Sequence, residues 1–88
     1  MEFIIDVQGL KLTSNDFAIK ELAIVAVNGS LNQPVSYVFK PPCAWEELPH
    51  EARTENHWLE RHFHGLGWDF GNIAYEEIPE ILERFETL

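Results

Sequence analysis

The stretch FAIKELAIVAV, from Phe17 to Val27, decides the fold. Its isoleucine and valine side chains fit the pleated surface of a sheet. Apolar residues occupy both of its alternating faces toward the end, which predicts a strand covered on both sides. Such a strand requires partner strands, and the flanking segments provide them.

Two shorter segments predict the partner strands. FIIDVQ, residues 3–8, is an apolar run that Gly9 is expected to end. VSYVFK, residues 35–40, alternates apolar and polar residues and is followed by two prolines, which cannot donate to a sheet ladder. Asn28-Gly29 indicates a tight turn between the second and third strands. Three strands with short connections predict an antiparallel meander.

The second half predicts two helices. Thr54 is a suitable N-cap for a helix that runs to His64, and Gly65 fits the left-handed position after its end. A last helix is expected from about Tyr75 to Phe85. Because proline is tolerated only in the first turn, Pro79 implies a start close to Glu76 or Glu77.

The fold class is therefore α+β, a three-stranded meander followed by two helices in one domain, residues 1–88. Ten apolar side chains on the inferred faces are predicted to be mostly buried. They are Ile5, Leu22, Ile24, Tyr37, Phe39, Trp58, Phe63, Ile78, Leu82 and Phe85.

Composition excludes several classes of protein. The 88 residues carry six Lys and Arg against fifteen Asp and Glu, a formal net charge of −9, which argues against a small nucleic-acid clamp. The sequence contains no run of about 18 apolar residues, so no transmembrane helix is predicted and no membrane partner is expected. The single cysteine excludes an intramolecular disulfide, and the N-terminus shows no secretory signal. An intracellular location, cytoplasmic or nuclear, is expected.

Five short motifs, in their order along the chain, resemble the N-terminal half of the DEDD 3′–5′ exonucleases of the ribonuclease H-like superfamily. Asp6-Val7-Gln8-Gly9 stands where that family ends its first strand in Asp-x-Glu, and Ile19 to Val25 resembles its next strand. Phe39-Lys40-Pro41-Pro42 resembles the end of the third strand. His64-Gly65-Leu66 and the segment from Pro79 to Phe85 resemble the loop and helix that follow.

The resemblance implies a partial ribonuclease H-like fold with an incomplete metal site. Gln8 replaces the second carboxylate, and an amide is a poorer ligand for Mg²⁺. The family's other acidic ligands lie on elements beyond these 88 residues. We therefore expect no catalytic residue, with Asp6 and Gln8 as residual candidates. We expect no cofactor beyond a weak Mg²⁺ contact at Asp6, and no catalysis from the isolated chain.

The histidines and the cysteine give weaker signals. His50, His57, His62 and His64 lack the spacing of a zinc site, so ordinary surface or helix-end roles are expected. When charged, His64, which stands beside Gly65, is expected to interact favourably with the negative end of the helix dipole at the C-terminus. The acidic neighbours of Cys43 should raise its thiol pKa, which disfavours a nucleophile.

Three functions remain open from the sequence. The first is a non-catalytic interaction or assembly module, forming a homodimer or binding another protein, with Trp68 and Phe70 as candidate contacts if their loop is exposed rather than part of the core. The second is part of an exonuclease whose remaining half comes from a longer product or a partner chain. The third, a nucleic-acid-binding module, is disfavoured by the net charge.

Overall fold

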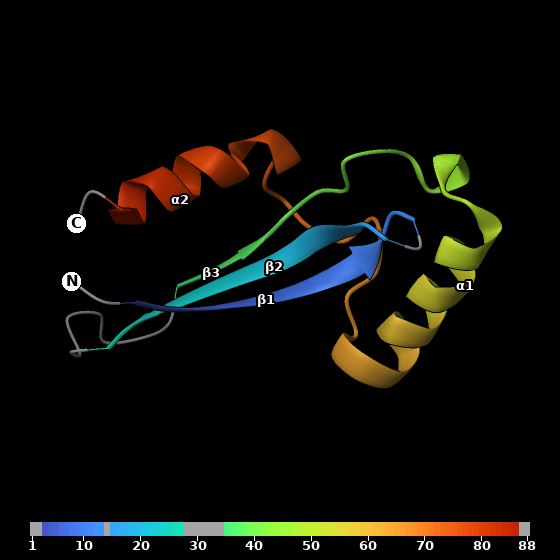
Figure 1. The fold of residues 1–88 in the computed structure, drawn as a ribbon, viewed down its shortest axis with the longest axis horizontal. Helices are drawn as coiled ribbons and strands as arrows, with labels where there is room; N and C mark the ends of the chain where they lie inside the picture. Colours follow the sequence, from blue (N-terminus) through green and yellow to red (C-terminus); the bar gives the residue numbers. More distant parts are fainter. Residues whose placement is uncertain (1–2, 14, 28–34, 87–88) are drawn as a thin grey trace.

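The computed structural model describes residues 3–13, 15–27 and 35–86 (Figure 1). It confirms the α+β class: a three-stranded antiparallel sheet is followed by two helices. The strands are β1 (Phe3–Lys11), β2 (Phe17–Ala26) and β3 (Val35–Val38), and the helices are α1 (His50–Leu59) and α2 (Ile78–Glu86). Short helical turns at Trp45–Glu47, Glu60–His64 and Tyr75–Glu77 complete the described elements. The predicted Asn28-Gly29 turn lies outside the described residues.

The sheet has the order β1-β2-β3, so the decisive stretch forms its centre. The prediction that β1 ends at Gly9 is wrong. A bulge between Gln8 and Gly9 lets the strand continue to Lys11. A Cβ on Gly9 would lie 2.8 Å from the carbonyl oxygen of Ala18. Glycine is therefore needed here for a close approach between strands and not for a stop.

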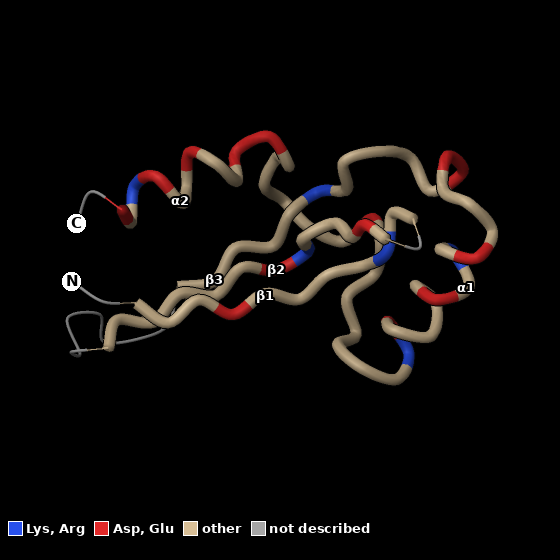
Figure 2. The backbone as a smooth tube through the Cα atoms, in the orientation of Figure 1, with Lys and Arg blue, Asp and Glu red and all other residues tan. Residues whose placement is uncertain are grey.

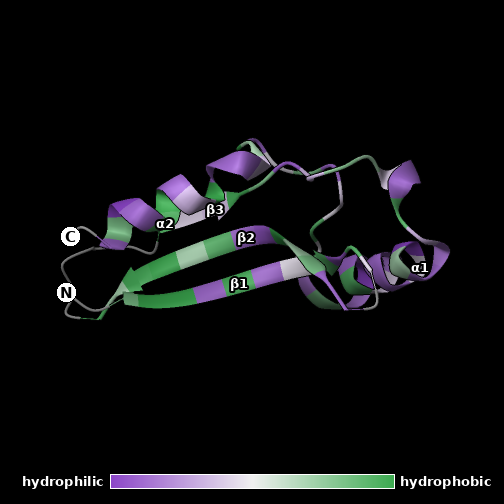
Figure 3. Ribbon diagram, turned by 45° about the horizontal axis from the view of Figure 1, so that its top comes forward, coloured by the Kyte–Doolittle hydropathy of each residue, from purple (hydrophilic) through white to green (hydrophobic). Residues whose placement is uncertain are grey.

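The prediction that β2 is covered on both sides is wrong. Its even-numbered residues from Ala18 to Ala26 are buried, whereas its odd-numbered residues are partly or fully exposed. Figure 3 shows α2 running along one face of the sheet while α1 lies near one end. One layer of helix therefore covers only one face of this half of the sheet.

The buried side chains form two clusters along the covered face of β2. One lies toward α1 and contains Leu10, Ala18, Leu48, Ala52 and Trp68. The other lies under α2 and contains Leu22, Ile24, Phe39, Ile78 and Ile81. The half-buried Tyr75 packs against both clusters.

Helix α1 begins four residues before the predicted cap. Its N-cap is Pro49, and the Thr54 hydroxyl instead donates to the carbonyl of His50 at 3.1 Å. The early start directs Ala52 and Asn56 toward the interior. The predicted stop is confirmed, because Gly65 has φ 72°, in the left-handed region that glycine enters most readily.

The core prediction is confirmed for Leu22, Ile24, Phe39 and Ile78, and in part for the half-buried Tyr37, Leu82 and Phe85. It is wrong for Ile5, Trp58 and Phe63, which are 50%, 59% and 68% exposed. Ile5 lies on an edge strand that α2 does not fully cover. Trp58 lies on the outer side because Ala52 and Asn56 define the inner face of α1. Phe63 lies in the turn Glu60–His64, whose π-helical winding departs from the 3.6-residue spacing on which the prediction rests.

None of the described helices is long and apolar enough to cross a membrane.

Candidate functional site

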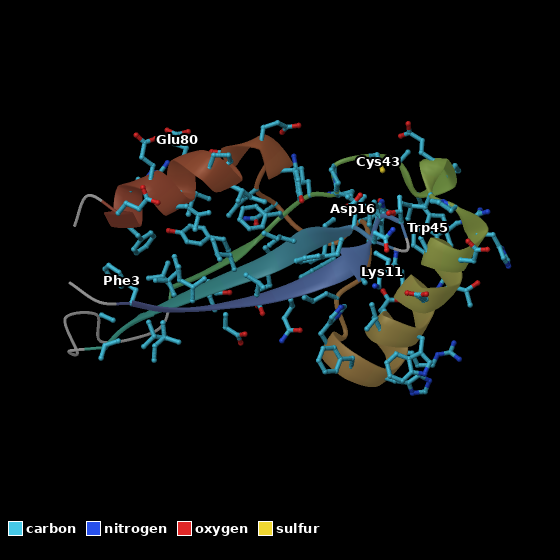
Figure 4. The ribbon with its side chains drawn as sticks, viewed as in Figure 1. Phe3, Lys11, Asp16, Cys43, Trp45 and Glu80 are labelled. Atoms are coloured by element: carbon cyan, nitrogen blue, oxygen red, sulfur yellow. The ribbon has the colours of Figure 1, made fainter. Side chains whose placement is uncertain are left out.

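An open cleft of about 230 Å³ lies where α1 meets the end of β1 and the 68–69 loop. It is lined by Leu10, Trp45, Asn56, His57, Glu60, Trp68 and Asp69. Figure 4 shows Trp45 and Lys11 at this end of the molecule, far from Phe3 at the end under α2. Segments distant in sequence therefore meet here.

Aromatic rings form the walls of the cleft. The Trp45 ring centroid is 5.0 Å from that of His57 and 6.2 Å from that of Trp68, with both pairs inclined at 63°. The Trp68 indole N–H donates to the carbonyl of Cys43 at 3.0 Å, which fixes the ring. The walls therefore form a corner of aromatic faces and edges rather than a flat stack.

Asn56 is buried in this region, and its amide is bonded to the backbone of β1. Its Oδ1 accepts a hydrogen bond from the Lys11 N–H at 2.6 Å, and its Nδ2 donates to the Lys11 carbonyl at 3.0 Å. The amide thus makes the pair of bonds that a neighbouring strand would make. Its role is to attach α1 to the sheet.

Two carboxylates, Glu60 and Asp69, give the cleft its charge, and its described lining includes no lysine or arginine. The Glu60 carboxylate lies against Gly67, where an added Cβ would collide with it. The site is therefore aromatic and negatively charged.

A buried lysine lies beneath the same region. Lys20 has no exposed surface, and its ammonium donates to the carbonyls of Phe39 at 2.6 Å, Trp68 at 2.8 Å, and Phe70. Burial lowers the pKa of Lys20 from its ordinary value, while the nearby Asp69 carboxylate acts in the opposite direction. Because three carbonyls occupy the ammonium, its arrangement is that of a structural tie between segments.

Asp6 and Gln8, the residual catalytic candidates, lie on the uncovered face of the sheet. Cross-strand register sets Asp6 opposite Ala23 and Gln8 opposite Glu21. The Ser36 hydroxyl donates to the Glu21 carboxylate at 3.2 Å. The exposed Asp6 thus lies in a polar stripe, and within the described residues no three His, Cys, Asp or Glu side chains gather as a metal site would require.

The four histidines do not converge. His57 lines the cleft, His50 and His62 are exposed, and His64 reaches back to β1. The His64 Nδ1 accepts from the Leu66 N–H at 2.9 Å, so Nε2 carries the proton and donates to the Gly9 carbonyl at 3.1 Å. The ring therefore joins the helix end to the bulge in β1.

Cys43 lies in a setting that opposes ionisation. Burial and the Glu47 carboxylate raise the pKa of its thiol above the ordinary value. The direction agrees with the expectation from its acidic neighbours.

Of the two predicted contact residues, Phe70 is 61% exposed and Trp68 only 5%. Trp68 belongs to the core cluster toward α1. The larger accessible apolar surface lies on β1, where Ile4, Ile5 and Val7 are 60%, 50% and 40% exposed. No sequence motif predicts the cleft, because its lining residues come from four separate segments.

The chain matches no protein-family model, no curated protein and no solved structure.

Proposed function

We propose that this chain is a non-catalytic assembly module that pairs with a second copy of itself through the edge of β1 from Phe3 to Val7. The observation that carries the proposal is the exposure of Ile4, Ile5 and Val7 on a nine-residue edge strand. Free strand edges offer unpaired N–H and C=O groups, and long apolar edges readily add another strand. Symmetric homodimers are the commonest way to pair such a surface.

Self-pairing suits the sequence of β1. Antiparallel pairing about Ile5 sets Ile5 opposite its own copy and Phe3 opposite Val7 of the second copy, so apolar residues meet on one face. The acidic Asp6 then faces Ile4 of the second copy and not another Asp6. The result would be a continuous six-stranded sheet, twice the three strands described.

The charge distribution also favours this edge. Figure 2 shows acidic residues concentrated in the helices and turns, whereas β1 carries a single acidic residue, Asp6. Two copies of a chain with a net charge of −9 repel one another. A contact at β1 therefore meets less of this repulsion than a contact at the acidic helices and turns.

The origin and location of the module belong to the same proposal. The order of the five motifs supports descent from an exonuclease-like fold that has lost catalysis. The single cysteine supports an intracellular, cytoplasmic or nuclear, location.

Sedimentation velocity at micromolar concentration should give a species of twice the 10.2 kDa chain mass. Ile5→Lys should shift the equilibrium to monomer, because Ile5 faces its own copy and the substitution places two ammonium groups directly opposite each other at the new strand junction. Phe63→Lys is the matched control, since Phe63 is 68% exposed and lies in the turn Glu60–His64, which reaches β1 at Gly9, beyond the proposed contact. It should leave the dimer unchanged.

Two results would contradict self-assembly through β1. One is a 10 kDa species alone across the concentration range. The other is dissociation by both variants, which would indicate general surface stickiness rather than a specific edge.

The alternative function is part of a metal-dependent exonuclease whose remaining half comes from a longer product or a partner chain. The observation in its favour is that Asp6, Gln8 and Glu21 share one sheet face. Two carboxylates are fewer than a two-metal site uses.

We expect no nuclease activity from the isolated chain. Purified protein incubated with labelled single-stranded DNA or RNA, in Mg²⁺ or Mn²⁺, should leave the substrate intact. Cleavage that disappears in Asp6→Asn would favour the exonuclease alternative. Cleavage that survives the substitution would indicate a contaminant.

A further inference from the structure

We propose that the cleft at α1 binds an organic ammonium group, with Trp45, Trp68 and His57 as aromatic walls and Glu60 and Asp69 as the source of negative charge. The site lies at the Leu10 end of β1, beyond the Phe3–Val7 stretch proposed for self-pairing, and goes beyond the assembly function. Its ligand is defined by chemistry: a compact cation with apolar substituents.

The walls suit a cation with an apolar surface. An aromatic face carries negative charge density, and indole is the strongest of the side-chain rings at attracting ammonium groups. The inclined rings of Trp45, His57 and Trp68 present a corner into which a rounded group fits. At about 230 Å³ the cleft is smaller than the roughly 300–1,000 Å³ of typical small-molecule sites, which favours a single group over a whole nucleotide cofactor.

The polar groups of the cleft disfavour an anion. The Asn56 amide is engaged by the Lys11 backbone, and the Trp68 indole N–H is engaged by the Cys43 carbonyl. The buried Lys20 interacts with Asp69 and partly compensates its negative charge. Glu60 is therefore the carboxylate that would attract a cationic ligand more strongly. Among the described residues that line the cleft, no lysine or arginine competes for these carboxylates.

The three tryptophans of the chain allow a direct test. We would follow the indole N–H signals by ¹H–¹⁵N correlation spectroscopy during titration with choline and, separately, with its neutral isostere 3,3-dimethylbutanol. Trp45 and Trp68 should shift with choline, with a dissociation constant of about 1 mM. Trp58, which is 59% exposed and does not line the cleft, should not shift. The neutral isostere should bind about three- to tenfold more weakly, because it lacks the cation–π attraction.

Two matched substitutions identify the carboxylate. Glu60→Gln removes a charge with little change of shape and should raise the choline dissociation constant about fivefold. Glu55→Gln removes a charge from an exposed position of α1 outside the cleft, and should change it less than about twofold. Both titrations are repeated in the Ile5→Lys chain, so that the result does not depend on self-assembly.

The source of the ammonium group is distinguished by two peptides of the same sequence, one with lysine and one with trimethyllysine. Tighter binding of either peptide than of choline assigns the site to a side chain of a protein. Weaker binding of both assigns it to a free small ammonium compound. Equal binding of choline and its neutral isostere, equal shifts at Trp58, or equal effects of the two glutamate substitutions would overturn the proposal, as would the absence of any shift at about 20 mM choline.

Discussion

Replacing Lys20 with methionine is expected to lower the free energy of unfolding by about 3 kcal/mol or more. Methionine matches the length of the lysine stem but leaves the carbonyls of Phe39, Trp68 and Phe70 without their donor. Each buried acceptor left unpaired costs about 1–3 kcal/mol, partly offset because the buried ammonium is removed. A chain of 88 residues has roughly 4–13 kcal/mol of stability in total, so a loss of this size is large.

Urea unfolding followed by tryptophan fluorescence measures the loss. Lys40→Met is the matched control, because Lys40 is exposed and the substitution is chemically the same. It should change stability by less than about 0.5 kcal/mol. Equal stability of the two variants would contradict the structural role of Lys20, since it would mean that the three carbonyls find other partners.

The pH dependence of the same pair gives a second readout. Burial lowers the pKa of Lys20 in the folded state, so the unfolded chain binds more protons between that lowered value and about 10.4. The contribution of Lys20 to the unfolding free energy therefore rises with pH through this window. The stability gap between the wild type and Lys20→Met should widen as the pH approaches about 10.4. A gap that narrows instead would mean that the pKa of Lys20 is raised on folding.

The position of Lys20 explains why it could not be predicted from the sequence. It stands between Ala18 and Leu22 on the covered face of β2, a place where period-2 alternation predicts an apolar residue. The two core clusters lie on either side of it, and its ammonium reaches carbonyls 19 to 50 residues away. Alternation identifies the face of a strand, but a bond between distant backbone segments leaves no periodic signal.

Other differences have a similar origin. The meander was predictable because each strand has its own apolar pattern and is followed by residues that end strands, as Pro41 follows the segment from Val35 to Phe39. The inner face of α1 was not, because its start depends on Pro49 and on the pair of bonds between Asn56 and Lys11. Asn56 reads in the sequence as an ordinary polar helix residue, and only its contact with a strand 45 positions away makes it a buried one.

The cleft depends on the same long-range geometry. In the sequence, Trp45, His57 and Trp68 are two tryptophans and a histidine on separate segments, and no motif links them. Their chemistry arises from proximity, 5.0 and 6.2 Å between ring centroids, and from the carboxylates at the same opening. Proximity of this kind is a property of the junction between the two halves of the chain.

The contact between the two halves of the chain also includes Gly71, a position that only glycine can occupy without movement of the backbone. Gly71 has φ 140°, and a Cβ added there would collide with the Phe39 carbonyl and lie 2.9 Å from the Lys40 nitrogen. The neighbouring bonds are short backbone contacts: Asn72 N–H donates to the Val38 carbonyl at 3.1 Å and Lys40 N–H donates to the Ile73 carbonyl at 2.8 Å. An alanine can fit only if the 68–73 segment moves away from β3.

Gly71→Ala is therefore expected to destabilise the chain by about 3 kcal/mol or more, comparable to Lys20→Met. Gly65→Ala is the control, because Gly65 also has a positive φ, 72°, but an added Cβ would meet nothing within 4 Å. Only the left-handed backbone is then strained, at a cost of about 1 kcal/mol. Urea unfolding of both variants separates backbone strain from steric exclusion. A loss for Gly71→Ala no greater than that for Gly65→Ala would show that the 68–73 segment yields easily. In that case the Lys20 bonds to the carbonyls of Trp68 and Phe70 could not be what holds the two clusters together, because those bonds move with the same segment.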